Sequence, residues 1–527
     1  MSERSKSIAK SVSILGIAGI LCKLIGVLFS IPLNMISSKV ATDFYLVYPT
    51  YTLLLTISSA GLPVAVSRLV AGFLARNDPR NAKNTFKFAL FTLFVIGFFF
   101  SLIMVILNPV LVNMVGVEET SGGYYAIAPC VMIVCVLSAF RGLFQGQQNM
   151  VPTAVSQLME QIGKVALSLP LAALGLKNSV AAGAAGALLG ITLSESLALV
   201  YMVIRYYRRR REFDMLRQDP ERTAEPPRKL LTRLFFISVP ITISACIIPF
   251  SQFIDSAMMI KRMVSAGLDP EVAHASYGLF TSVVIRLINI PTALALAVSM
   301  SLVPAISACK AREDDVALKR ETNTGMRYAF LIGFPCSVGM SVLARQIVTF
   351  FYGSVSDFTP DKLTLASELL TFSAMTVVLF TVVQATSSIL QGLRKQRIPM
   401  YTMIIGVAVK IMLNYILIGT EGIDIHGGPY ASIACYSIVM VLNIIYVCRH
   451  AHMRFNVMEW LVRPGLAAAA MGIVVYLLSV LLPVNRLLTI LEVAAGVLVY
   501  FAAALVFKAL SLDDIKALLK RKGKKHA

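Results

Sequence analysis

Six basic side chains fall inside long apolar stretches of the sequence: Lys23, Arg68, Lys164, Arg286, Arg345 and Lys410. A Lys or Arg near the centre of a bilayer costs roughly 2.5 to 3.5 kcal/mol, so each needs water, a partner or a route to the membrane surface. Such groups can bind anions, because a guanidinium or an ammonium group donates hydrogen bonds to phosphate oxygens.

Three of these cations, Lys23, Arg68 and Arg286, have no acidic residue three or four positions away. Their partners must therefore come from other segments. Asp255 is the best acid inside an apolar stretch, and the lesser candidates are Glu195 and Glu492. One acid cannot neutralise three cations, so we expect a water-filled cavity with excess positive charge. Snorkelling or tight pairing is the alternative. A cationic cavity suits an anionic substrate such as a diphosphate and suits a cationic drug poorly.

Polar side chains in the same stretches can hydrogen bond the hydroxyl groups of a sugar. The candidates are Gln252 and Asn289, with Ser251 and Asn34. Each of them also suits a structural role, because amide and hydroxyl groups commonly join neighbouring membrane helices.

The remaining charged residues have structural interpretations. Glu160 and Lys164 stand four apart on one expected helix and can neutralise each other as an ion pair. We interpret Lys410 and Arg345 as snorkelling residues, whose long side chains reach towards the membrane surface. We assign these four residues a structural or secondary role.

The composition indicates the elements that must position these residues. Hydrophobic residues make up 57% of the 527-residue chain and charged residues only 14%, far from the roughly 25% charged expected of a soluble globular protein. The net charge of +20 could suggest nucleic acid, but a nucleic-acid-binding protein would not carry this much apolar sequence. The sequence therefore predicts an all-α polytopic membrane protein.

Apolar runs between charged or Gly/Pro-rich breaks predict about fourteen transmembrane helices. They cover residues 12–36, 44–73, 86–112, 124–145, 152–176, 180–204, 234–260, 275–307, 328–350, 366–390, 399–419, 428–448, 458–482 and 487–507. Basic residues concentrate in alternate loops, which predicts that both termini are cytoplasmic. The eight cysteines lie mostly within apolar runs without a C-x-x-C pair, so we interpret them as small hydrophobic residues.

An internal repeat organises the spans. The stretch from Gln145 to Lys164 and the stretch from Gln391 to Lys410 both begin with Gln-Gly and end on Lys at the same spacing, and AVSRLVA at residues 65–71 resembles AVSMSLVPA at 297–305. Two parallel halves around a central cavity follow from this repeat. The predicted domains are an N-terminal lobe (1–206), a basic cytoplasmic linker (207–233), a C-terminal lobe (234–448), and two final spans with a basic tail (449–527).

Motifs for several other activities are absent from the sequence. It contains no Walker A motif and no H-E-x-x-H, and its outer loops are too short for an enzymatic site. We therefore expect a transporter without a catalytic residue, a metal site or a cofactor, and the sequence identifies no coupling ion.

Three motifs carry a resemblance to a known family: RGLFQGQQNMVPTAVSQLMEQIGK, GLPVAVSRLVAGFLARNDPR and SLVPAISACKARED. They resemble the polysaccharide-transporter branch of the multidrug/oligosaccharidyl-lipid/polysaccharide (MOP) exporter superfamily. Within it, the chain resembles the stage V sporulation protein B and YtgP group, relatives of the MurJ lipid II flippases. The resemblance covers essentially the whole chain.

The resemblance implies two six-helix lobes and two extra helices in a MATE/MOP-like fold with alternating access. It also implies basic cavity residues on helices 1, 2 and 8, here Lys23, Arg68 and Arg286, an acid on helix 7, here Asp255, and a lipid-tail groove at about residues 458–507. Lys23 stands where MurJ itself tends to have Arg.

The expected function is that of a flippase in the bacterial cytoplasmic membrane. It would move an undecaprenyl-diphosphate-linked cell-wall or polysaccharide precursor, most simply lipid II, to the outer leaflet. Its partners would be this lipid-linked saccharide, membrane lipids and cell-wall synthesis enzymes, and not nucleic acid. The alternatives are a cation-coupled drug exporter of the same superfamily and a non-transporting scaffold for wall-synthesis enzymes.

Overall fold

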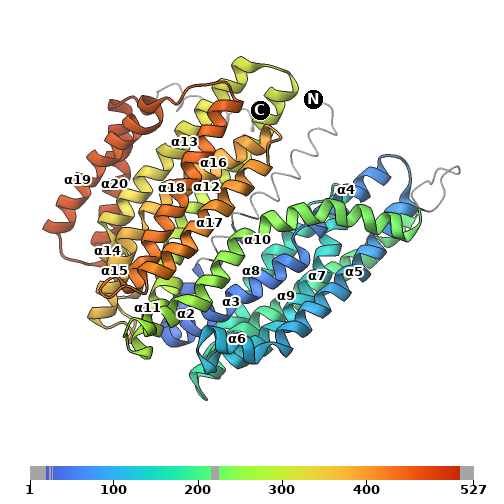
Figure 1. The fold of residues 1–527 in the computed structure, drawn as a ribbon, viewed down its shortest axis with the longest axis horizontal. Helices are drawn as coiled ribbons and strands as arrows, with labels where there is room; N and C mark the ends of the chain where they lie inside the picture. Colours follow the sequence, from blue (N-terminus) through green and yellow to red (C-terminus); the bar gives the residue numbers. More distant parts are fainter. Residues whose placement is uncertain (1–18, 20, 23–24, 27, 215–224, 511–527) are drawn as a thin grey trace. The chain divides into compact units, whose positions relative to one another are not determined.

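The computed structural model describes residues 19, 21–22, 25–26, 28–214 and 225–510. The chain divides into two compact units, unit 1 (Met1–Gly278) and unit 2 (Leu279–Ala527). Both are built from helices (Figure 1).

Unit 1 is a bundle of long helices. Its elements are α2 (Ser30–Ile36), α3 (Ser38–Ser59), α4 (Leu62–Leu74), α5 (Pro79–Ile106), α6 (Asn108–Val115), η1 (Glu118–Thr120), α7 (Ser121–Gly146), α8 (Val151–Leu176), α9 (Val180–Asp214), α10 (Pro227–Ser265) and α11 (Pro270–Gly278). Its hydrophobic core joins side chains of α3, α4, α5, α7 and α9, such as Phe44, Phe86 and Tyr124.

Unit 2 contains a second bundle and the C-terminal helix pair. Its elements are η2 (Leu279–Val284), α12 (Ile285–Ala311), α13 (Asp315–Val342), α14 (Ala344–Tyr352), α15 (Pro360–Ser373), α16 (Met375–Gly392), α17 (Arg397–Leu417), η3 (Asp424–His426), α18 (Gly427–His450), η4 (Met458–Val462), α19 (Arg463–Leu481) and α20 (Arg486–Val506). The single tryptophan, Trp460, is fully buried in this unit beside Phe455.

Ten helices in the described part of the chain are long and apolar enough to cross a membrane, or eleven if the bent pair α13 and α14 counts as one span. The predicted all-helical, multi-pass membrane protein is thereby confirmed. Helix α8 is not among the ten, although it has 26 residues; Glu160 and Lys164 lie within it. The number fourteen stays a prediction.

Both units contain the same helix-to-helix turn. Between α4 and α5, Asn77 has a φ of 54° and Asp78 caps α5 by accepting a hydrogen bond from the Asn81 backbone N–H at 3.1 Å. Between α12 and α13, Glu313 has a φ of 55° and Asp314 caps α13 in the same way at 2.8 Å. A side-chain oxygen at this position satisfies one of the free N–H groups of the helix start.

A second repeated turn follows the Gln-Gly pairs. Gln148 has a φ of 59° after α7, and Arg394 has a φ of 61° after α16. Gly146 and Gly392 end the two helices, and a Cβ at either would lie 2.7 Å from the Cβ of Val70 or of Ile306. Each glycine thus permits close contact with a neighbouring helix. These turns support the internal repeat.

The predicted second span, 44–73, is a broken helix. Helix α3 ends at Ser59 and α4 begins at Leu62, followed by Pro63 in its first turn. Gly61 lies against α10, where its backbone N–H donates a hydrogen bond to the Thr242 hydroxyl at 3.1 Å. A Cβ there would be 2.1 Å from the Ser238 carbonyl oxygen, so only glycine fits without a shift.

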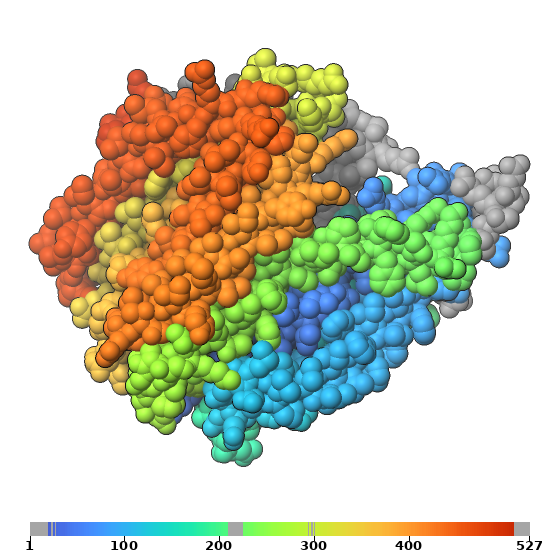
Figure 2. Space-filling view, in the orientation of Figure 1, coloured from blue at the N-terminus to red at the C-terminus, as the bar shows by residue number. Residues whose placement is uncertain are grey.

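Helix α10 packs against α3, α4 and α5 and belongs to unit 1. It forms part of the surface of that unit, where it appears green beside the blue helices (Figure 2). Helices α9 and α10 also extend into both ends of the predicted linker 207–233, whose middle, 215–224, lies outside the described residues. The lobe boundaries at residues 206 and 234 stay predictions.

Candidate functional site

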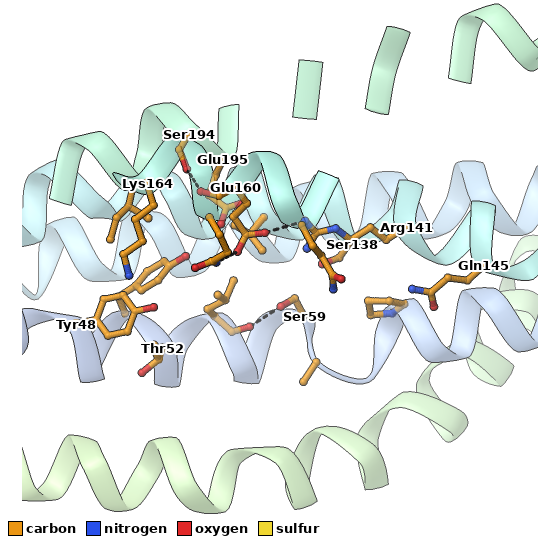
Figure 3. A pocket seen from close by; sticks show the side chains of 18 residues that line it. Tyr48, Thr52, Ser59, Ser138, Arg141, Gln145, Glu160, Lys164, Ser194 and Glu195 are labelled. Atoms are coloured by element: carbon orange, nitrogen blue, oxygen red, sulfur yellow. Dashed lines mark hydrogen bonds and ion pairs between the residues drawn. The ribbon is translucent and has the colours of Figure 1, made fainter. Parts of the chain in front are cut away.

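A polar cavity of about 360 Å³ lies inside unit 1. Side chains from α3, α7, α8 and α9 point into it (Figure 3). Its polar lining residues are Tyr48, Tyr51, Thr52, Ser59, Ser138, Arg141, Gln145, Gln157, Glu160, Gln161, Lys164, Ser194 and Glu195. We call this space the unit 1 cavity.

An ion pair between α7 and α8 crosses the unit 1 cavity. Arg141 Nη2 lies 2.8 Å from Glu160 Oε2, with 14% and 22% of the two side chains exposed. Arg141 Nε also donates a hydrogen bond to the Ser156 hydroxyl at 3.1 Å, and Gln161 Nε2 donates to Glu160 Oε1 at 3.3 Å. A charge-assisted bond of this length is among the stronger polar contacts in proteins.

Lys164 lies among aromatic rings, one turn along α8 from Glu160. Its Nζ is 4.6 Å from the ring centre of Phe29, 4.9 Å from that of Tyr48 and 5.6 Å from that of Phe44. An ammonium group in contact with ring faces is stabilised by their quadrupoles, more so when water is excluded. The predicted Glu160–Lys164 ion pair stays a prediction.

A second carboxyl group lies beside that of Glu160. Glu195 of α9 is 4% exposed, and its side chain lies close to that of Glu160 (Figure 3). Its Oε2 is buried without a hydrogen-bond partner among the described residues, as is Oε1 of Gln157 on α8. The cavity thus contains two buried hydrogen-bond acceptors whose capacity is unused within the described chain.

The residues predicted to form a cationic clamp lie on several helices. Lys23 lies outside the described residues, although Gly26 of the same segment lies against Gln161, so that a Cβ there would be 3.2 Å from Oε1. Arg68 is exposed on α4 of unit 1. Arg286 is half-buried on α12 of unit 2, where its Nε donates to the Thr281 carbonyl at 3.3 Å. Because these residues belong to different units, their predicted clustering stays a prediction.

The other predicted site residues are distributed along the same bundles. Asp255 is half-buried and Gln252 exposed on α10, while Asn289 is half-buried on α12. Arg345 is exposed next to the 73° bend between α13 and α14, and Lys410 is half-buried on α17. No group of three His, Cys, Asp or Glu side chains placed to hold a metal occurs within the described ranges.

The unit 1 cavity was not predicted from the sequence. Arg141 stands near the end of its apolar run, and the sequence suggested Glu195 only as a lesser partner for a cation of another segment. The available signal was the 20-residue stretch from Gln145 to Lys164, which contains Glu160, together with one acid in the next apolar run. No spacing rule relates residues on α7, α8 and α9, since packing alone brings these helices together.

Comparison with known families gives two matches. The model for the family described as polysaccharide biosynthesis protein matches residues 8–310, and the MatE model matches residues 240–416. The first covers more than half of the chain, and it confirms the resemblance seen in the motifs.

Individual proteins are also similar to this chain over most of its length. The lipid II flippase MurJ of Bacillus subtilis (strain 168) is 27% identical over 86% of this chain and 85% of that protein. Stage V sporulation protein B of the same organism is 25% identical over 97% of both. Among solved structures, lipid II flippase MurJ in an inward closed conformation matches 94% of this chain with a TM-score of 0.71 and 15% identity, covering 98% of that chain.

A multidrug resistance MATE family transporter of the MOP superfamily, in an inward-facing conformation, matches 84% of this chain and 100% of its own. The TM-score is 0.67 at 14% identity. These similarities confirm the MATE/MOP-like fold.

Proposed function

Because the chain belongs to the polysaccharide biosynthesis protein family and is a multi-pass membrane protein, we propose that it is a flippase for a lipid-linked precursor. The substrate is an undecaprenyl-diphosphate-linked saccharide of the cell wall, most simply lipid II. The similarity to lipid II flippase MurJ over 86% of this chain carries the proposal.

The proposed mechanism uses the cationic clamp. The head group enters from the cytoplasm, its diphosphate is bound by Lys23, Arg68 and Arg286, and the polyprenyl tail stays in the lipid. Binding then favours closure and outward opening, with both termini on the cytoplasmic side. The substrate carries negative charge outward, so a membrane potential can drive it with about 2.3 kcal/mol per charge per 100 mV.

The test is a leaflet-resolved assay in vesicles with the purified protein and lipid II. The double substitution Arg68→Ala and Arg286→Ala should abolish translocation while the protein still inserts into the membrane, because the diphosphate loses two of its three cations. Arg345→Ala is the matched control, since it removes an exposed Arg from α14, and it should retain transport. Wild-type translocation by the double variant would refute the clamp.

A cation-coupled exporter of the same superfamily is the second candidate, favoured by the MatE match to residues 240–416. This candidate predicts that an imposed cation gradient drives export of a cationic dye and that lipid II does not move. The same vesicles distinguish the two functions.

A further inference from the structure

We propose that the unit 1 cavity binds the saccharide part of the substrate and thereby selects glycosylated over sugarless lipid diphosphate. This inference rests on the proposed function. It assigns the diphosphate to the predicted clamp and the sugar to Gln157 and Glu195, which act as specificity-determining residues.

The charge of the unit 1 cavity favours a neutral ligand. Two cationic and two acidic side chains line it in the described chain, and Arg141 is already bonded to Glu160. A phosphate group offers only acceptors and negative charge at neutral pH, so it would meet the carboxyl groups of Glu160 and Glu195 unfavourably. A sugar has no such charge.

The unused acceptors favour a ligand that donates hydrogen bonds. Glu195 Oε2 and Gln157 Oε1 are buried and lack partners in the described part of the chain. A buried acceptor without a partner is costly, and the cost is recovered when a donor arrives. Sugar hydroxyls and acetamido N–H groups are such donors, whereas a diphosphate and a polyprenyl chain have none to give.

The size of the cavity fits one part of a head group. A volume of about 360 Å³ lies near the lower limit of small-molecule sites, which range from roughly 300 to 1,000 Å³. The space suits a saccharide unit and is too small for the whole lipid-linked molecule.

The second copy of the repeat shows that the fold does not require these polar groups. Counted from Gly392 as Arg141 and Glu160 are counted from Gly146, the equivalent positions are Ser387 and Gly406. Helices α16 and α17 nevertheless form the same turn as α7 and α8. The ion pair in unit 1 therefore has a use beyond joining two helices.

The experiment measures binding of two lipids to the full chain in nanodiscs: undecaprenyl diphosphate and the same lipid carrying a disaccharide. Glu195→Leu and Gln157→Leu each remove a buried acceptor and put no donor or acceptor in its place. Each should weaken binding of the glycosylated lipid about tenfold, the factor for one hydrogen bond of ordinary strength, and leave the sugarless lipid unchanged. Gln391→Leu, the exposed Gln of the second copy, is the matched control and should alter neither affinity.

Each other outcome overturns the inference in a distinguishable way. If the wild-type protein binds neither lipid, the proposed function fails, and this inference fails with it. If it binds both lipids and the variants keep the wild-type preference, only the saccharide site is wrong. Equal loss of both lipids, with an unchanged unfolding midpoint, would assign the cavity to the diphosphate. An altered pH dependence of lipid binding at constant sugar preference would overturn the saccharide site and assign Glu195 to proton binding.

Discussion

The ion pair between Arg141 and Glu160 permits a sharp test of the unit 1 cavity. We expect Arg141→Met to destabilise the protein more than Glu160→Gln. Loss of Arg141 leaves the carboxyl groups of Glu160 and Glu195 beside each other without the guanidinium, whereas loss of the Glu160 charge leaves Arg141 close to Glu195. A buried carboxylate that has lost its counter-cation is strongly unfavourable, and a second carboxyl group beside it cannot replace the cation.

The expected loss in the free energy of unfolding follows from how far the two side chains of the ion pair are exposed. Exposed ion pairs contribute about 0 to 1 kcal/mol, and breaking a buried pair from one side costs about 3 to 5 kcal/mol. With side chains 14% and 22% exposed, Arg141→Met should lower the free energy of unfolding by about 3 kcal/mol and Glu160→Gln by about 1.5 kcal/mol. The double variant should be more stable than Arg141→Met alone, because the added Glu160→Gln substitution removes the buried charge that Arg141→Met leaves without its partner.

The assay is thermal unfolding in detergent at one heating rate, since large chains often unfold irreversibly. For a unit of this size, 3 kcal/mol corresponds to a midpoint lowered by roughly 6 °C. Arg233→Met is the control, because the Arg233–Glu225 contact of 2.9 Å has side chains 39% and 21% exposed; screening by water should limit the change to about 0.5 kcal/mol. Additive losses in the double variant, or equal losses in the two single variants, would refute this account.

Three further substitutions test the packing of unit 1. Gly146→Ala should lower the free energy of unfolding by about 1 to 3 kcal/mol, because its Cβ would lie 2.7 Å from the Val70 Cβ; Gly72→Ala, with no atom within 4 Å, should raise it by about 0.5 kcal/mol. A loss in both glycine variants would contradict the contact geometry. Asp43→Asn weakens the 2.9 Å contact of this buried carboxylate with His274 Nε2 on α11, and the unfolding midpoint should drop by an amount equivalent to about 1 kcal/mol. An unchanged midpoint would show that the contact contributes nothing to stability.

Much of the fold could be predicted from the sequence. Long apolar runs indicated the helices, and the Gln-Gly-to-Lys spacing indicated an internal repeat. In the structure both copies have a residue of positive φ two positions after the glycine, Gln148 and Arg394. The break inside 44–73 was not predicted, because it depends on the approach of α10 to Gly61. Apolar runs report length and composition, and they carry no information on a contact between distant helices.

The sequence by itself determined that this chain is a multi-pass helical membrane protein, that it belongs to its family and that it contains an internal repeat. These properties reside in composition and in local spacing. Only the tertiary structure decided that Arg141 bonds Glu160, that Lys164 contacts aromatic rings and that Glu195 faces the same cavity. The reason is physical. A helix that is apolar on nearly all sides has no polar stripe to show which face meets its neighbour, so the partners of its few charges are chosen by helix packing.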